Sequence, residues 1–446
     1  MLKAGFAEVD ITPTGVVHLL GYFTERLSDE ALDPLFAKAA VLDDGHSTAA
    51  ILVLDSAAVV KDDAQTIRHA ICSDPGLSID EVLITATHTH TAPSPVELFP
   101  TGLDREYVDR ILIPGAIRAI TSACKNVAEV SIEMGEAAEQ ELAFTRRHFM
   151  ADGSVKTNPR KGDPHIVKPE REPYHTVRVY SFRSSERLTG LLVLAANHCD
   201  TIGGNKVSAD WPGQMANALK DHFGNDVPVI FLCGCSGDVN HFDPTNPDPQ
   251  TSYDEAIRIG TGYARFALEA LKNTRPVAAE NVSVVKRTVR IPRRSITQEE
   301  IWRAKQILNN SSRTVTAQLK SEDLAIGNPA VEAFYADQLL GLSESSKGKD
   351  AEDVAIACLA VDKHAFAFLP GEVFTDIGEQ IRTESPFEIT STIELFEHFW
   401  GYIPLKKHFE RGGYEPRSTR YNCLAQNAGK LLIQNVGELL KQLQGD

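Results

Sequence analysis

The side chains best suited to chemistry gather in four short clusters, and each cluster directly follows an apolar run of strand length. The clusters are ITATHTHTAPSP (84–95), VLAANHCD (193–200), IFLCGCSGDVN (230–240) and AFLPGE (367–372). In sheet proteins the strands fix the positions of such residues, while the loops after them stay open to solvent. We therefore expect the four clusters to assemble one site at the C-terminal ends of strands.

Two histidines in the first cluster, His88 and His90, lie two residues apart. On an extended segment both point to the same face and could meet one metal ion or one substrate. Ordinary hydrogen-bonded histidines show the same spacing, and two histidines fall short of the usual three protein ligands. The case for a metal grows when His198 and Glu372 are added, because two imidazoles and a carboxylate are a common set for catalytic zinc with an open position for water.

Other polar residues in the clusters fit chemistry less well. The spacing of Cys233 and Cys235 does not match a zinc knuckle, so we expect two small buried core residues. Ser236 does not sit in a G-x-S-x-G nucleophile elbow, because Asp238 replaces the final glycine. Asp210 precedes a predicted helix in SADWPG and could either cap that helix or support the site.

The elements that must position these clusters alternate between strands and helices. We predict hairpins at 37–55 around Asp44-Gly45, at 175–198 and at 358–370, and further strands at 81–87, 227–234 and 390–396. We predict helices at 62–72, 104–124 with a kink at Pro114, 211–223, 252–273, after a Thr297–Glu300 capping box, and 423–443.

This order predicts an α/β protein with mixed β-sheets flanked by helices, not a purely parallel sheet. The polar stretch 310–350 is a candidate insertion.

Composition excludes several classes of protein. The 446 residues carry a formal net charge of −16, which repels nucleic acids and anionic bilayers. No apolar run approaches the roughly 18 residues that span a bilayer, so we expect a soluble protein without integral membrane association. The chain begins without the features of a secretory signal, and its seven cysteines are scattered. We expect a cytoplasmic protein, or one whose leader sequence has been removed.

Eight pieces of the chain, taken in order, resemble the catalytic N-terminal domain of the neutral/alkaline non-lysosomal ceramidase family. They are AGFAEVDITP (4–13), ATHTHTAP (86–93), RRHFMADGSVKTNP (146–159), NHCDTIGG (197–204), SADWPG (208–213), CGCSGDVN (233–240), LPGE (369–372) and GGYEP (412–416).

The resemblance implies a zinc site formed by His88, His198, Glu372 and Tyr414. It also implies that His90 and Arg146 lie close to the reacting group, where they polarise it or steady an oxyanion. On spacing alone, Tyr414 would be a plain packing residue and Arg146 a solvated arginine.

The sequence departs from the family at two points. Asn240 stands where the ceramidases have a serine needed for activity, and the chain leaves no room for their immunoglobulin-like domain after the last motif. We therefore expect one catalytic domain over 1–446 and a substrate other than ceramide.

These features together predict a metal-dependent hydrolase, amidase- or esterase-like, in which Zn²⁺ activates water against an amide, ester or lactone carbonyl. Asp238 and Asn240 are expected to line the pocket, with Asp238 holding its loop through hydrogen bonds. Two alternatives stay open: a hydrolase of glycans or sugar derivatives with the same metal site, and a non-catalytic binding protein that keeps zinc for structure. The expected partner is a small-molecule substrate, and the oligomeric state is left open.

Overall fold

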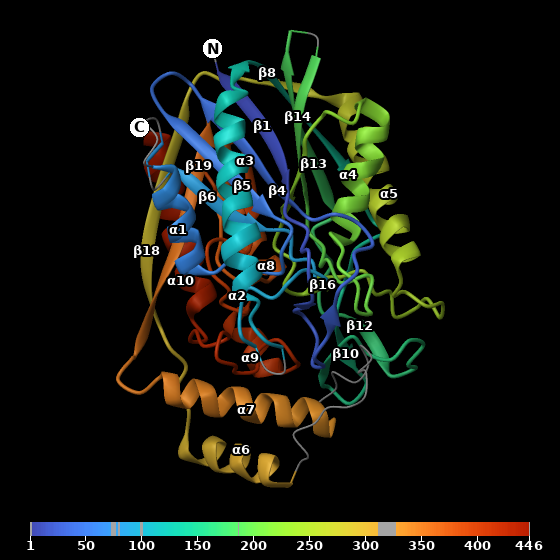
Figure 1. Ribbon diagram of the computed structural model, residues 1–446. Helices are drawn as coiled ribbons and strands as arrows, with labels where there is room; N and C mark the ends of the chain where they lie inside the picture. Colours follow the sequence, from blue (N-terminus) through green and yellow to red (C-terminus); the bar gives the residue numbers. More distant parts are fainter. Residues whose placement is uncertain are drawn as a thin grey trace.

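The computed structural model describes residues 2–72, 77–78, 81–98, 101–185, 187–310 and 327–445. Its framework is three mixed sheets, and each sheet combines antiparallel neighbours with one parallel pair of strands (Figure 1). The predicted α/β class with mixed sheets and flanking helices is therefore confirmed.

The first sheet has the strand order β6-β5-β4-β1-β7, in which β5 and β6 are parallel. Its strands are β1 (Lys3–Asp10), β4 (Phe36–Asp43), β5 (Thr48–Leu54), β6 (Val82–Ala86) and β7 (Ala128–Glu129). The hairpin predicted around Asp44-Gly45 is confirmed, because β4 and β5 pair in antiparallel register from Asp43↔Thr48.

The second sheet has the order β15-β14-β13-β8-β17, in which β14 and β15 are parallel. Its strands are β8 (Ser131–Ala138), β13 (Thr176–Ser184), β14 (Arg187–Ala195), β15 (Val229–Cys233) and β17 (Arg275–Val277). The third has the order β18-β19-β20-β22, in which β20 and β22 are parallel. Its strands are β18 (Val282–Pro292), β19 (Ala351–Val361), β20 (His364–Phe368) and β22 (Ile389–Ile393).

One face of each sheet contributes to a shared apolar core. Phe6 of the first sheet, Tyr180 of the second and Phe368 of the third belong to the same buried cluster, and each is at most 5% exposed. Burying a side chain of this size stabilises the fold by roughly 1.5–3 kcal/mol. The shared core holds the three sheets together and thereby brings their strand ends close to one another.

Helices cover the opposite face of each sheet (Figure 1). Their apolar sides pack as pairs: α1 (Lys61–Ile71) and α3 (Ile113–Lys125) on the first sheet, α4 (Asp210–Phe223) and α5 (Tyr253–Ala270) on the second, α8 (Thr375–Glu384) and α10 (Ala428–Gly445) on the third. Among the described residues, no helix is long and apolar enough to cross a bilayer.

The helix predicted over 104–124 is irregular, as Pro114 led us to expect. A turn of α2 (Arg105–Tyr107) widens into a π-helical turn, η1 (Val108–Leu112), before α3 continues. Because Pro114 has no N–H, the α-helical hydrogen-bond pattern is interrupted one turn upstream, where the helix widens.

A helical excursion leaves the third sheet between β18 and β19. The two strands pair as far as Pro292↔Ala351, and α6 (Gln298–Asn310) and α7 (Pro329–Ser345) lie outside that pair, below the sheets in Figure 1. The predicted capping box of α6 is confirmed: Thr297 N–H donates to Glu300 (2.7 Å) and Glu300 N–H donates to the Thr297 hydroxyl (3.2 Å). Residues 311–326 of the candidate insertion lie outside the described residues.

Shorter elements complete the site region. They are β2 (Val17–His18) with β3 (Leu27–Ser28), β9 (Phe144–Thr145) with β16 (Val239–Asn240), β10 (Arg147–Met150) with β11 (Val155–Thr157) and β12 (Ile166–Pro169), β21 (Glu372–Val373) with β23 (Tyr402–Ile403), η2 (Leu271–Asn273) and α9 (Lys406–Arg411).

Candidate metal centre

Each of the three sheets supplies one predicted ligand from a strand of its parallel pair. His88 follows the end of β6 at Ala86, His198 follows the end of β14 at Ala195, and Glu372 follows the end of β20 at Phe368. Parallel neighbours end at the same edge of a sheet, so the shared core directs all three loops to one place.

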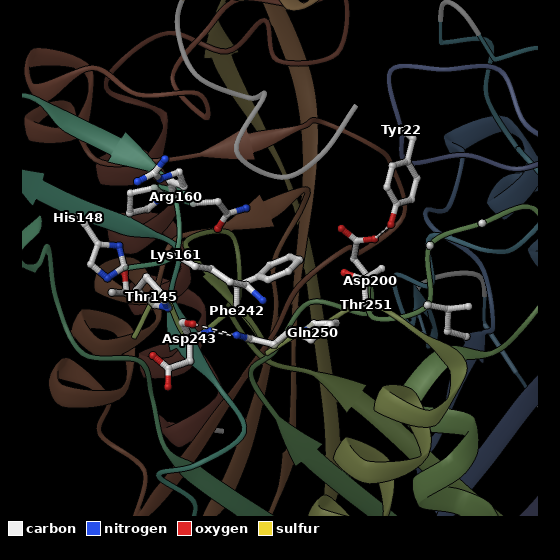
Figure 2. A pocket seen from close by; sticks show the side chains of 17 residues that line it. Tyr22, Thr145, His148, Arg160, Lys161, Asp200, Phe242, Asp243, Gln250 and Thr251 are labelled. Atoms are coloured by element: carbon white, nitrogen blue, oxygen red, sulfur yellow. Dashed lines mark hydrogen bonds between the residues drawn. The ribbon is translucent and has the colours of Figure 1, made fainter. Parts of the chain in front are cut away.

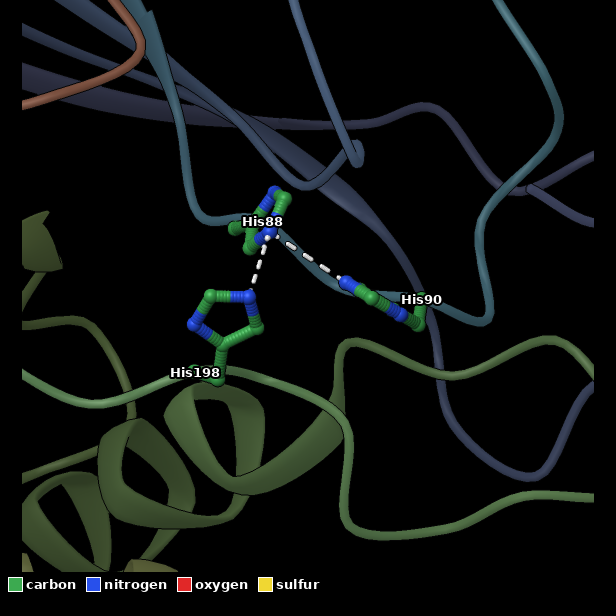
Figure 3. Close-up of side chains that lie close together, drawn as sticks. All are labelled: His88, His90 and His198. Carbon is green, nitrogen blue, oxygen red and sulfur yellow. Dashed lines mark hydrogen bonds between the residues drawn. The ribbon is translucent and has the colours of Figure 1, made fainter. Parts of the chain in front are cut away.

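Three imidazoles and one carboxylate converge closely (Figure 3 shows the imidazoles). The Nε2 atom of His88 lies 3.2 Å from Nε2 of His198 and 3.2 Å from Nε2 of His90. The Oε2 atom of Glu372 lies 3.3 Å from His88 Nε2 and 3.2 Å from His198 Nε2. His88, His198 and Glu372 are all at most 3% exposed.

Backbone carbonyls fix which nitrogen of two imidazoles carries hydrogen. His88 Nδ1 lies 2.7 Å from the Ala57 carbonyl oxygen, and His198 Nδ1 lies 3.0 Å from that of Ser236. A carbonyl only accepts, so each Nδ1 donates and each neutral ring turns the lone pair of Nε2 toward the carboxylate of Glu372. A buried set of acceptors facing one another requires a cation between them, either a proton or a metal ion.

The pKa values point to the same requirement. Burial lowers the pKa of His88, but the Glu372 carboxylate outweighs it, so the net shift is upward. Burial lowers the pKa of His198 to about 4, and burial with the two neighbouring imidazoles holds that of His90 well below its usual value. Although burial raises the pKa of Glu372, His88 and His198 bring it well below its usual range. Glu372 is therefore stable as a carboxylate only with positive charge beside it, and the histidines next to it are suited to bind a divalent cation that supplies this charge.

The two histidines of the first cluster meet for a different reason from the predicted one. His88 has a φ of +70°, in the left-handed region, so the segment is not a regular extended strand. His88 N–H donates to Ser56 O (2.9 Å) and His90 N–H donates to Cys199 O (3.0 Å), and these bonds hold the bend. The bend, and not strand alternation, turns both rings inward, and His90 lies close enough to be a third imidazole ligand.

Arg146 lies beside the imidazoles as the resemblance implied. Its Nη1 is 3.3 Å from His198 Nε2 and 3.3 Å from the hydroxyl of Tyr402. Burial alone would lower the pKa of Arg146. The neighbouring Tyr402 and Glu415 raise this pKa by more than burial lowers it, so the guanidinium stays charged. Glu415 forms an ion pair with this guanidinium, with its Oε1 atom 3.3 Å from Arg146 Nε.

Tyr414 lines the same cavity as His88, His90 and Glu372, and its ring centre lies 5.6 Å from the guanidinium carbon of Arg146. Its side chain interacts with Tyr335, and no hydrogen bond joins its hydroxyl to Arg146 or His198 among the described residues. Tyr402, which sequence reasoning missed, also lines this cavity and stacks on His198 with a ring separation of 6.4 Å. Its hydroxyl accepts the Arg146 hydrogen bond described above. Of the two tyrosines, Tyr402 thus has the better contacts to the convergent groups.

Asp238 lies in the loop after β15 and Asn240 ends the short strand β16, and their side chains bond to Thr375 and Asn158. Asp238 accepts from the N–H and hydroxyl of Thr375 (2.8 and 2.7 Å), and its carbonyl accepts from Arg146 N–H (3.0 Å). Asn240 donates to Asn158 at 2.8 Å. Neither is among the described residues that line the cavity at the histidines, contrary to the expectation that they line the pocket.

A buried carboxylate that sequence reasoning missed, Glu394, connects two of the site loops. It accepts from Ser236 N–H (3.1 Å), from the Ser236 hydroxyl (2.5 Å) and from Val373 N–H (2.7 Å). Burial raises its pKa to about 8. The signal available in the sequence was a glutamate in the predicted strand 390–396, directly after the residues that form β22 and before Leu395 and Phe396, since an acid among apolar residues is costly to bury without partners.

The segment SADWPG supports the loop that follows His198. The Asp210 carboxylate accepts from Thr201 N–H (2.9 Å) and from the Thr201 hydroxyl (2.5 Å), and the N-cap of α4 is Ala209. Trp211 Nε1–H donates to the carbonyl of His198 (2.9 Å). Of the two roles left open for Asp210, the structure therefore favours support of the site. Cys233 and Cys235 are buried free thiols, as predicted.

Comparison with solved structures shows the fold. The neutral ceramidase from Pseudomonas aeruginosa matches with a TM-score of 0.75 and 14% identity, over 100% of this chain and 74% of that chain. A structure described as a ceramidase complexed with C2 matches equally well, over 75% of its chain. No family model and no curated protein sequence matches. The chain thus has a ceramidase-like fold.

Proposed function

We propose that this protein is a zinc-dependent hydrolase that cleaves a carbonyl substrate, an amide, ester or lactone, other than ceramide. The observation that carries the proposal is the convergence of lone pairs from His88 and His198 on the carboxylate of Glu372. The ceramidase-like fold supports a hydrolase, because the two matching structures are both ceramidases.

His88, His198 and Glu372 would hold the ion, with a tyrosine completing the set. The resemblance assigns Tyr414 to that place, whereas the contacts of Tyr402 support Tyr402. A bound Zn²⁺ supplies two kinds of chemistry: it polarises a carbonyl oxygen and lowers the pKa of water toward about 7.

The protein's own groups would stabilise the charge that develops on the substrate. The Arg146 guanidinium is cationic at every relevant pH and directs Nη1 toward the convergent nitrogens, so it can donate to an oxyanion there. His90 stays neutral and retains one N–H for the same oxygen or for the leaving group. Losing one donor of this kind typically lowers kcat by about 10²–10³.

The test is hydrolysis of short chromogenic acyl esters and amides before and after treatment with a chelator. The proposal requires that the chelator abolish hydrolysis, that added Zn²⁺ restore it, and that Arg146→Ala lower kcat by about 10²–10³. A matched control is Arg303→Ala, whose side chain is 68% exposed on α6. Tightly bound zinc without hydrolysis would instead favour a structural metal.

A further inference from the structure

Two unlike cavities meet beside the candidate metal centre. The smaller, of about 90 Å³, contains His88, His90 and Glu372. The larger, of about 760 Å³, is an open cleft (Figure 2). Tyr22 lines both cavities, its ring lies 6.1 Å from that of His90, and its hydroxyl donates to Asp200 on the wall of the cleft. The two cavities therefore share the side chain of Tyr22 in their walls.

The small cavity has an aromatic wall beside the residues of the metal centre. Phe23 packs against Phe334 of α7, with 4.7 Å between their ring centres, and Tyr335 of the same helix extends this wall. A cavity of about 150 Å³ accepts benzene, so this one has room for only a few carbon atoms. It suits a short acyl chain and excludes a long one.

The cleft carries two cations on the segment that also holds Arg146. Asn158 N–H donates to the carbonyl of Arg146 (2.6 Å), and Arg160 and Lys161 follow Asn158 after one proline, Pro159. Within the described part of the chain, no carboxylate lies at ion-pair distance from Arg160. The Lys161 ammonium donates to the backbone carbonyl of Asp248.

The two carboxylates of the cleft are already hydrogen-bonded. Asp200 accepts from Tyr22, and Asp243 accepts from the N–H and hydroxyl of Thr245 (2.8 and 2.6 Å). Arg160 is exposed and has no carboxylate partner there, so it can pair with an anion from solution. The protein as a whole has a net charge of −16, so two adjacent cations in this cleft differ from the negative charge of the rest of the chain.

We infer that the substrate is a short-chain acyl derivative of a polar, carboxylate-bearing molecule: the acyl chain occupies the cavity at Phe334, and the anionic part pairs with Arg160 and Lys161 in the cleft. This inference rests on the proposed function and names the substrate class of the same site. In the hydrolysis, the oxygen of water bonds to the carbonyl carbon and the bond from that carbon to nitrogen or oxygen breaks. One proton of the water passes to the leaving atom, and a short carboxylic acid is released.

The test measures equilibrium binding, by calorimetry, of probes that cannot be hydrolysed. The probes are N-butanesulfonyl-L-glutamate, its neutral diamide and N-hexadecanesulfonyl-L-glutamate, each added to the zinc-loaded full chain. We expect the butyl diacid to bind at least tenfold more tightly than either other probe. Equal or tighter binding of the diamide or of the hexadecyl probe overturns the inference, and so does the absence of binding at millimolar concentration.

Two variants locate the effect. Arg160→Ala combined with Lys161→Ala should abolish the tenfold preference for the diacid. The control, Arg303→Ala combined with Lys305→Ala, removes the same charge from the exposed face of α6. In the control the preference for the diacid should stay within twofold of the wild-type value. Phe334→Ala should reduce the preference for the butyl over the hexadecyl probe. If the diacid preference survives the first double variant, the cleft is not its source and the inference is wrong. If the butyl diacid binds as expected but N-butanoyl-L-glutamate is not hydrolysed, the proposed function alone fails.

Discussion

At the scale of single residues, Glu415 keeps two arginines of the site buried. Its two oxygens lie 3.3 Å from Arg146 Nε and 2.5 Å from Arg147 Nη1, and all three side chains are at most 6% exposed. Glu415→Gln would remove the carboxylate that faces Arg146 and one of the two that face Arg147, which keeps Glu170, so we expect it to lower the free energy of unfolding by about 3–5 kcal/mol. Urea unfolding measures this.

The matched control for that change is Glu410→Gln. Glu410 pairs with Lys406 at 3.8 Å on the surface of α9, where an ion pair is worth at most about 1 kcal/mol. If Glu415→Gln costs no more than this control, the buried ion group does not hold Arg146 in place.

The two tyrosines of the cavity make a second prediction at this scale. We expect Tyr402→Phe to weaken metal binding by about 10–100-fold, because it removes the hydroxyl that contacts Arg146 beside His198. Tyr414→Phe should change metal affinity far less, because the Tyr414 hydroxyl makes no hydrogen bond to Arg146 or His198 among the described residues. Competition with a calibrated zinc indicator measures both, and the reverse order would restore Tyr414 as the ligand.

The sequence could predict the histidines and the glutamate of the site but not the better tyrosine. His88, His198 and Glu372 follow apolar runs that end at one edge of each sheet, so their placement is a consequence of strand geometry. Tyr402 follows a loop after β22 that has no periodic pattern, and only tertiary contacts bring it to Arg146. The left-handed backbone of His88 was equally invisible, because histidine gives no local signal for it.

At the scale of elements, the loops after β15 and β20 approach each other too closely for any side chain at Gly237. A Cβ atom there would lie 2.5 Å from the carbonyl oxygen of Glu372. Gly237→Ala should therefore lower the free energy of unfolding by about 1–3 kcal/mol and, since it displaces Glu372, weaken metal binding. Thermal unfolding and a zinc titration measure the two effects.

The same substitution at Gly437 is the matched control. Gly437 lies within α10 and has open space around it, so alanine should raise stability by up to about 1 kcal/mol through its helix propensity. Equal effects at both positions would show that the close approach of the two loops does not make alanine at Gly237 cost any free energy of unfolding.

Most elements could be predicted from hydrophobic periodicity, whereas their pairing across long distances could not. The hairpin of β4 and β5 is local and follows from Asp44-Gly45. The parallel pair of β20 and β22 depends on α8 crossing between the strands, and periodicity does not say which strands such a helix connects.

At the scale of the whole molecule, ligands from three sheets make metal binding a property of the entire fold. Zinc that binds only the folded chain stabilises it by mass action, by about 2.7 kcal/mol at one hundred times Kd. If residues 1–446 form one domain, as we predict, a chelator should lower the midpoint of a single thermal transition. Calorimetry with and without chelator measures this. A second transition whose midpoint does not change with the chelator would show an independent domain.

The central claim is that lone pairs from His88 and His198 and the carboxylate of Glu372 form a zinc site. The most direct test is the zinc content of purified protein, measured by plasma mass spectrometry. The proteins compared are the wild type, His88→Ala, Glu372→Gln and a control, His46→Ala. His46 is exposed in the turn between β4 and β5, away from the site. We predict about one zinc per chain in the wild type and the control, and less than about one tenth in the two site variants. A zinc-free wild type, or equal zinc in all four proteins, would contradict the claim.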